Sequence, residues 1–222
     1  MKDDRKSALY LAITEAVMEE IKANQIEVVQ EESLLRVPVS ISARHVHLEK
    51  VHADILFGKE YEFQKHRDIS QPGQYACVEQ VTIVGPKSSI ERVRIVAPLR
   101  RQTQVEVSRT DAIKLGIQPP VRHSGDVAGS APITIIGPKG KIHLKEGCII
   151  ADRHIHMSPA DANTFGVANH QKVQVEVDGE KAGVMGNVTI RVSERYALDM
   201  HIDTDDANAF AIKGTEYLTL IK

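Results

Sequence analysis

Two short segments carry histidines at a spacing that favours metal binding. Each reads arginine, histidine, an aliphatic residue and histidine, at residues 44–47 and 153–156. On an extended strand the two histidines of a segment share one face, about 6–7 Å apart at their Cα atoms. With 10 histidines in 222 residues, one such pair is expected by chance roughly 0.4 times. Two copies with matching flanks therefore favour a metal site over satisfied structural histidines.

A repeat in the chain supplies a third ligand for each pair. Glu106, His156 and His201 are each followed by a capping residue at +2, Asp at +5, Ala at +6 and a small residue at +10. A looser version follows His47. The pattern is typical of a strand that ends in the N-cap of a short helix, so we expect each ligand at the mouth of a barrel. The two predicted ligand sets are His45, His47 and Glu106, and His154, His156 and His201.

Three imidazole or carboxylate ligands per set are typical of catalytic zinc, which keeps one coordination position open. Two sets predict two zinc ions per chain, although cobalt or manganese would accept the same ligands. Cys77 and Cys148 stand alone in the sequence. We expect them to be reduced, buried thiols of a cytoplasmic protein.

Cationic and amide side chains lie near these ligands in the sequence. Arg100 and Arg101 precede Glu106 by six and five residues. A guanidinium group suits bidentate binding of phosphate oxygens, and a solvated turn is the alternative interpretation. Residues 71–75, Gln-Pro-Gly-Gln-Tyr, predict a polar loop whose amides could contact a ligand.

Short β-branched runs, many of them separated by Gly, Pro and Asn turns, recur from residue 35 onward. This texture is typical of barrels or sandwiches rather than alternating β-α-β units. Together with the repeat, it predicts a mainly β fold of two small β-barrels capped by short helices. The predicted strands are 37–41, 81–84, 93–96, 104–107, 133–136, 147–150, 173–177, 188–192 and 217–221.

Residues 7–23 predict an N-terminal amphipathic helix, because apolar residues recur there at spacings of three and four. Docking on the protein body and binding to a partner are both open for this helix. The net charge of −2 and 4% aromatic residues argue against a nucleic-acid partner. No apolar run approaches the about 20 residues that span a bilayer, so no membrane partner is expected.

Six segments, taken in order, resemble the PduL-type phosphate acyltransferases (phosphotransacylases) over roughly residues 36–212. The resemblance implies an enzyme that interconverts acyl-CoA and phosphate with acyl phosphate and CoA. It also implies two β-barrels with short helical caps and a dinuclear zinc site. The segments are residues 42–48, 71–76, 84–87, 98–112, 151–159 and 200–209.

The resemblance implies roles for individual residues as well. It selects the same six metal ligands as the spacing does, and it makes Arg100 the catalytic, phosphate-binding arginine. The implied CoA contacts are Ile41, Ser42, Ala43, Lys87, Arg94 and Asn208. The implied polar residues of the pocket are Gln71, Gln74, Gln104, Ser124 and Arg191.

The resemblance further implies how the chain is divided. Residues 34–43 would join 152–222 in one barrel, 44–151 would form the other with the active-site loop, and 1–33 would be a helix and linker. A homodimer is implied. Relatives in bacterial microcompartments, for instance in propanediol degradation, often carry an encapsulation helix, so residues 7–23 are expected to contact shell proteins.

Two other functions remain open from the sequence. A dinuclear zinc hydrolase of thioesters or phosphate esters would release acid without using phosphate. A zinc-stabilised scaffold or shell-binding module would have closed, four-ligand sites and no turnover. Acetyl and propanoyl groups differ by one methylene, worth only about 1–3 kcal/mol of discrimination, so the acyl preference is also open.

Overall fold

Alternating buried and exposed residues build the strands of this protein, and β11 (Lys172–Val177) is a clear example. Its three valines are buried while the polar residues between them are exposed. A strand with one face on a core requires this alternation. The computed structural model describes residues 35–222, and the predicted N-terminal helix lies outside them.

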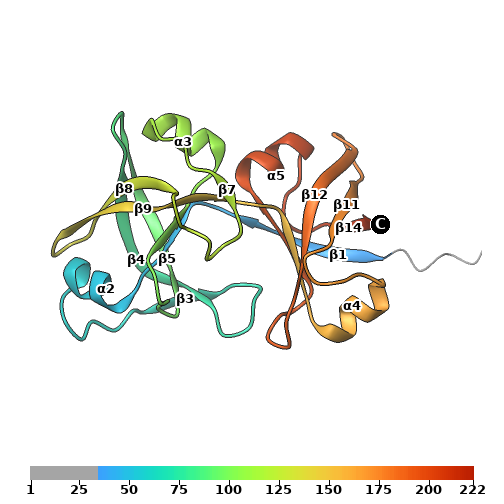
Figure 1. Ribbon diagram of the computed structural model, residues 1–222, viewed down its shortest axis with the longest axis horizontal. Helices are drawn as coiled ribbons and strands as arrows, with labels where there is room; N and C mark the ends of the chain where they lie inside the picture. The colour runs from blue at the N-terminus through green and yellow to red at the C-terminus, as the bar shows by residue number, and fades with distance from the viewer. Residues whose placement is uncertain (1–34) are drawn as a thin grey trace, which may run out of the picture. The chain divides into compact units, whose positions relative to one another are not determined.

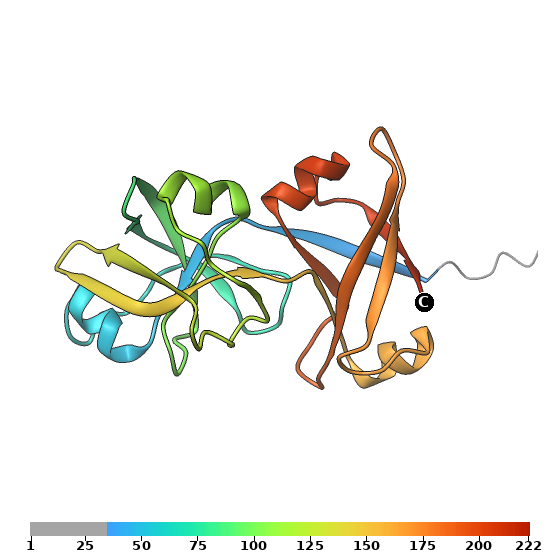
Figure 2. The same cartoon turned by 45° about the horizontal axis from the view of Figure 1, so that its top comes forward.

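Six strands close into a barrel that we call the C-terminal barrel, in the order β1-β13-β10-β12-β11-β14. Its first strand is far from the others in sequence: β1, blue in Figures 1 and 2, pairs in parallel with β13 and antiparallel with β14. The remaining bounds are β1 (Arg36–Ser42), β10 (His154–Met157), β12 (Gly183–Val192), β13 (Asp199–Asp203) and β14 (Tyr217–Ile221).

A second set of six strands, the central barrel, runs β4-β5-β2-β6-β9-β8 and returns to β4. Two short strands extend it, β3 beside β4 and β7 beside β9. The bounds are β2 (His45–His47), β3 (Lys65–Asp68), β4 (Tyr75–Val84), β5 (Ser89–Ala97), β6 (Gln104–Glu106), β7 (Val121–Arg122), β8 (Ala131–Ile136) and β9 (Lys141–Ala151).

The four helices within residues 35–222 each follow a strand that carries a predicted ligand. They are α2 (Lys50–Phe57), α3 (Arg109–Leu115), α4 (Pro159–Phe165) and α5 (Thr204–Phe210). Ser108 and Ser158 cap α3 and α4 as the repeat predicted, and each forms a capping box, with Asp111 and Asp161 respectively. Asp203 caps α5. The looser sequence before α2 has no side-chain cap, which fits its departure from the repeat.

Each barrel has its own apolar core, and this decides where the histidines point. Val46, between His45 and His47, is fully buried in the core of the central barrel, and Ile155 is buried likewise in the C-terminal barrel. Side chains alternate along a strand, so the histidines face away from the cores. The expectation that the ligands sit at the barrel mouths therefore needs correction: they project from the outer side of the barrel walls.

The two barrels repeat one another strand for strand around these residues. In the C-terminal barrel β10 is parallel to β12 and antiparallel to β13, which sets His154 opposite His201. In the central barrel β2 is parallel to β5 and antiparallel to β6, which sets His45 opposite Glu106. The prediction of a mainly β fold with two small barrels and short helices is confirmed.

Candidate metal centre and substrate pocket

The central barrel brings His45 and His47 of β2 together with Glu106 of β6. The two imidazole Nε2 atoms lie 3.0 Å apart. The carboxylate lies 3.6 Å from Nε2 of His45 and 3.9 Å from Nε2 of His47. Three side chains that the sequence spacing predicted as one set thus lie together, and they could hold a metal ion.

Hydrogen bonds on the outer side of both rings determine what faces inward. His45 Nδ1 lies 2.9 Å from the carbonyl oxygen of Ala43, and His47 Nδ1 lies 3.2 Å from that of Val96. A carbonyl oxygen only accepts, so we assign the ring proton to each Nδ1 and a lone pair to each Nε2. Two lone pairs and a carboxylate then face one another without a proton between them. A cation would stabilise this arrangement.

The environment of these groups favours their metal-binding forms. Burial lowers the pKa of His47 well below its usual value, and the charges of His45 and Arg100 add to the effect. Burial alone would raise the pKa of Glu106, but the two imidazoles and the Ser124 hydroxyl outweigh it and lower that pKa to about 2. A neutral ring and an ionised carboxylate are the forms that ligate metals.

The C-terminal barrel brings together His154, His156 and His201. Their ring centroids lie 4.7 to 5.1 Å apart. His154 Nδ1 lies 2.8 Å from the carbonyl oxygen of Asp152, which again leaves a bare Nε2. His156 Nδ1 is buried and has no hydrogen-bond partner among residues 35–222. A buried polar atom without a partner is rare, and a bound ion would account for it.

The environment of this second group also lowers the pKa values of its histidines. Burial, together with the charges of the neighbouring histidines, lowers the pKa of His154 to about 4 and that of His156 to about 2. Asp199 Oδ2 lies 2.9 Å from His201 Nε2 but out of hydrogen-bonding alignment. Ser70 Oγ lies 3.1 Å from the same nitrogen. A carboxylate and a hydroxyl beside an imidazole typically orient it for ligation.

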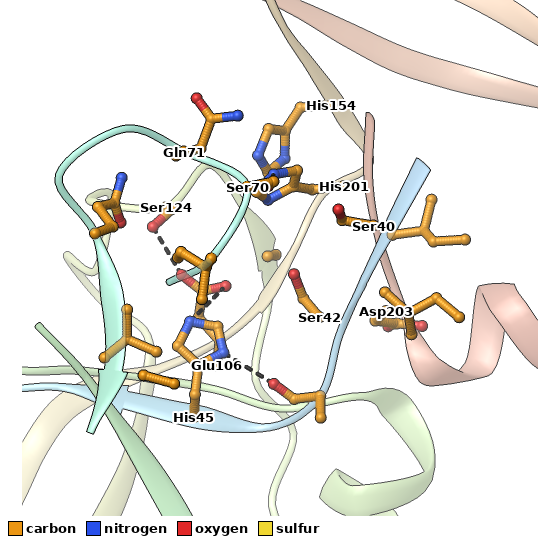
Figure 3. Close-up of a pocket in the computed structure, with 18 of the residues that line it drawn as sticks. Ser40, Ser42, His45, Ser70, Gln71, Glu106, Ser124, His154, His201 and Asp203 are labelled. Atoms are coloured by element: carbon orange, nitrogen blue, oxygen red, sulfur yellow. Dashed lines mark hydrogen bonds and ion pairs between the residues drawn. The ribbon is translucent and has the colours of Figure 1, made fainter. Parts of the chain in front are cut away.

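Both groups line one cavity of about 680 Å³. Figure 3 shows Glu106 and His45 on one side of it, with His154, His201, Ser70 and Gln71 also around it. A cavity of this size is within the usual range for a small-molecule site. Both candidate metal groups are therefore open to one bound substrate.

Arg100 enters the cavity through a network centred on Ser124. The Ser124 hydroxyl accepts hydrogen bonds of 3.0 Å from the Arg100 guanidinium and 3.0 Å from the Gln104 amide. It donates one of 2.7 Å to Glu106. Two accepted bonds and one donated bond use the full capacity of a hydroxyl. The guanidinium is thereby held beside the first candidate metal group (His45, His47 and Glu106), and its other N–H groups remain available to bind an anion.

Most, but not all, of the predicted pocket residues border this cavity. Those that line it are Ile41, Ser42, Ala43, Gln71, Gln74, Arg94, Arg100, Ser124 and Arg191. Gln104 is buried behind Glu106, to which its amide donates a hydrogen bond. Lys87 and Asn208, predicted as CoA contacts, do not line the cavity. Lys87 lies in the turn between β4 and β5, and Asn208 lies in α5.

The sequence reasoning missed several lining residues. Ser70 and Tyr196 both contact the second metal group, Ser70 through His201 and Tyr196 through a 4.2 Å ring contact with His156. Arg67 and Lys213 add cationic side chains to the lining. Ser70, Tyr196 and Lys213 lie in loops and Arg67 lies in β3, at positions that no spacing rule predicts. Only the polar composition of the loop near residue 71 signalled any of them.

Comparison with known proteins defines the class. A family model for phosphate propanoyltransferase matches residues 38–213. A phosphate propanoyltransferase from Lachnoclostridium phytofermentans is 55% identical over 83% of this chain and 87% of its own. Relatives of the same name come from Priestia megaterium, 55% identical over 78% and 80%, and from Thermotoga maritima, 46% identical over 95% and 99% of the respective chains.

The protein is therefore an enzyme of the acyltransferase class. Within that class, the chain belongs to the phosphate propanoyltransferase family, and the resemblance noted in the sequence is confirmed. Among the helices of residues 35–222, none has the length and apolar character to cross a membrane.

Proposed function

We propose that this protein interconverts acyl-CoA and phosphate with acyl phosphate and CoA at a dinuclear zinc site. One observation carries the proposal: two groups of inward-facing acceptors line the same cavity as Arg100. The family name of the relatives supports the reaction class. Propanoyl-CoA and acetyl-CoA are both proposed substrates, because one methylene is a weak basis for discrimination.

The residues present fit zinc. Each group offers three nitrogen or oxygen ligands and no thiolate, which suits zinc with a coordination position left for substrate. The ligands would be His45, His47 and Glu106 for one ion, and His154, His156 and His201 for the other. When bound, zinc polarises a thioester carbonyl and offsets the negative charge of phosphate.

The side chains of the protein would hold the two reactants in place. Arg100 would bind phosphate oxygens through the guanidinium nitrogens that Ser124 does not use. Because Arg100 lies close to Glu106, it would hold the phosphate next to His45, His47 and Glu106. Holding two reactants in line lowers a bimolecular barrier by several kcal/mol, roughly 7–11 in the best cases.

Direct attack of phosphate on the thioester needs no nucleophilic side chain. Both cysteines are buried in the core of the central barrel, outside the cavity lining. Burial raises the pKa of Cys77 to about 11 and that of Cys148 to about 12. Neither thiol is thus suited to form an acyl-enzyme at neutral pH.

CoA would enter along β1 and the segment that follows it. Ile41, Ser42 and Ala43 line the cavity there, and Arg94 offers a cation to the nucleotide phosphates. Lys87 and Asn208 are proposed as contacts for parts of CoA that extend beyond the cavity. Gln71, Gln74, Gln104 and Arg191 are proposed to shape the polar side of the pocket.

The rate of CoA release from propanoyl-CoA and acetyl-CoA, with and without phosphate, tests the reaction. We expect release only with phosphate, and an equal amount of acyl phosphate trapped by hydroxylamine. Release that is independent of phosphate would identify a thioester hydrolase instead. No release under either condition would support a scaffold role.

We also propose a cytoplasmic homodimer that enters a bacterial microcompartment through residues 7–23. The amphipathic pattern of that segment supports the proposal. Deleting residues 1–24 should leave transferase activity intact and abolish co-sedimentation with shells. Unchanged co-sedimentation would contradict the role of the segment.

A further inference from the structure

The arginine of each Arg-His-aliphatic-His segment is not a metal ligand, yet both copies make the same kind of contact. The Arg44 guanidinium lies 2.9 Å from the carboxylate of Asp111 in α3. The Arg153 guanidinium lies 3.1 Å from the carboxylate of Asp206 in α5. Each contact joins a strand that carries two histidines to a helix in the same barrel.

The two acceptor carboxylates occupy equivalent positions. Asp111 follows Glu106 by five residues, and Asp206 follows His201 by five residues. Each arginine therefore directly precedes the first ligand of its group and reaches the helix that follows the third ligand. The ion pair therefore connects the segment that carries the first two ligands of a group to the helix that follows its third ligand.

Asp161 shows that the repeated Asp does not by itself require an arginine. It follows His156 by five residues, and its carboxylate accepts hydrogen bonds from the backbone N–H and hydroxyl of Ser158. No arginine contacts it among residues 35–222. The arginine contact thus accompanies the helices that follow Glu106 and His201, and is absent where the preceding histidine already belongs to an Arg-His-aliphatic-His segment.

We propose that Arg44–Asp111 and Arg153–Asp206 are equivalent positioning clamps, each fixing the third metal ligand against the His-aliphatic-His strand of its group. The proposal rests on the proposed metal sites. A guanidinium has a planar, directional donor set, so it holds a carboxylate at a set angle as well as a set distance. Residues that orient metal ligands without binding the metal commonly influence metal affinity, and losing one lowers that affinity about 10- to 100-fold.

The C-terminal pair gives the cleaner test, because Arg44 also lines the cavity whereas Arg153 does not. The experiment uses the full chain and measures the zinc dissociation constant of each equivalent by competition with a chromophoric chelator. Arg153→Gln and Asp206→Asn should each weaken one of the two equivalents by about 10- to 100-fold. Combining them should add little, since both remove the Arg153–Asp206 contact. Asp206→Asn is the more specific of the two, because Arg153 also donates a 3.0 Å hydrogen bond to the Gly186 carbonyl.

Two further variants and one spectrum exclude a merely structural effect. Asp161→Asn removes a helix-capping carboxylate without touching a clamp and should leave both zinc affinities unchanged. Exchanging the partners, Arg153→Asp with Asp206→Arg, should restore part of the lost affinity. The visible absorption of the cobalt-loaded protein should change in the Arg153 and Asp206 variants and not in the Asp161 variant.

Zinc affinities equal to the wild type in both single variants would overturn the clamp, as would an equal loss in Asp161→Asn. A wild-type protein that binds no zinc would overturn the metal sites and the clamp together. A wild-type protein that binds two zinc ions but makes no acyl phosphate would overturn the proposed reaction alone. Arg44→Gln should weaken the binding of the other zinc ion. This result would assign each clamp to its own group of ligands.

Discussion

Arg100 illustrates how much of the site depends on single side chains. It is held by one hydrogen bond to Ser124, and that hydroxyl also contacts Gln104 and Glu106. Burial lowers the pKa of Arg100, with the charge of Arg191 adding to the effect and that of Glu106 opposing it. A phosphate dianion would supply the negative charge that this partly buried cation lacks.

Replacing Arg100 by alanine should mainly weaken the use of phosphate. Hydrogen bonds to charged groups contribute about 1.5–3 kcal/mol each, so the KM for phosphate should rise at least tenfold. Steady-state kinetics with varied phosphate checks this. Arg101→Ala is the matched control, because that neighbouring side chain is exposed and does not line the main cavity; an unchanged phosphate KM in Arg100→Ala would contradict the assignment.

The two thiols should be inert in the folded protein. Burial raises the pKa of Cys77 to about 11 and that of Cys148 to about 12, so both stay protonated at neutral and mildly alkaline pH. Thiolate is the reactive form. Titration with a disulfide reagent at pH 8 should detect fewer than one thiol in the native chain and two after denaturation.

Rapid labelling of the native protein would show that one thiol is accessible. A raised folded-state pKa stabilises the fold up to the unfolded value near 9.0, and this contribution is lost as the pH rises through about 11 to 12.

The grouping of the six candidate ligands could be predicted from the sequence, because strand alternation and the repeat bring them together without knowledge of the fold. The contacts that give them their chemistry could not. The carbonyl groups of Ala43 and Val96 determine the ring tautomers, and no side-chain type signals a backbone acceptor. Ser70 reaches His201 across 131 positions of sequence, which is beyond any local pattern.

At the scale of elements, the loop between β3 and β4 is pinned by Gln71. Its side-chain amide donates a 3.1 Å hydrogen bond to the carbonyl of Ala197 and accepts one of 3.3 Å from the Ala197 N–H. Gln71 was predicted as a polar residue of the pocket, and it does line the cavity. Its amide also bonds the loop between β12 and β13, which helps to hold Ser70 close to His201.

Gln71→Ala should free both backbone groups of Ala197. Leaving fully buried polar groups without partners costs about 1–3 kcal/mol. Ala197 is half-buried, so the loss should be at the lower end of this range, and unfolding should need less denaturant. Hydrogen exchange at the Ala197 amide should become faster. Gln74→Ala, in the same loop, is the control and should leave that exchange rate unchanged. Exchange in Gln71→Ala as slow as in the wild type would contradict the role of Gln71 in holding this loop.

Helix ends were the most predictable elements. The repeat predicted a capping residue two positions after Glu106, His156 and His201, and Ser108, Ser158 and Asp203 are the N-caps of α3, α4 and α5. Strand lengths were less predictable: β4 and β9 extend six residues earlier than their β-branched runs. Polar residues there still pair in the sheet, because tertiary pairing overrides local propensity.

At the scale of the whole molecule, duplication explains why there are two candidate metal groups. Equivalent strands set His154 opposite His201 and His45 opposite Glu106. We propose that residues 34–43 with 152–222, and residues 44–151, are the two structural domains, since β1 pairs only with strands of the C-terminal barrel within residues 35–222. The sequence showed the repeat. That β1 joins the C-terminal barrel, although the central barrel follows it in the chain, was expected only from the family resemblance.

Asp205 links the two halves of this duplication. Its carboxylate accepts a 2.7 Å hydrogen bond from the Thr110 N–H and a 3.2 Å bond from the Ser108 hydroxyl. Thr110 follows Glu106 by four residues, as Asp205 follows His201. The helices that follow the two third ligands thus meet at equivalent positions, which helps to hold both metal groups against one cavity.

The most direct test of the account is a metal titration of the metal-free protein, read out as acyl phosphate formed from acyl-CoA and phosphate. We expect no activity without metal and a rise that saturates at two zinc equivalents per chain. Glu106→Gln should bind one equivalent tightly and remain nearly inactive. Full activity in the metal-free protein, or saturation at a single equivalent, would contradict a dinuclear site.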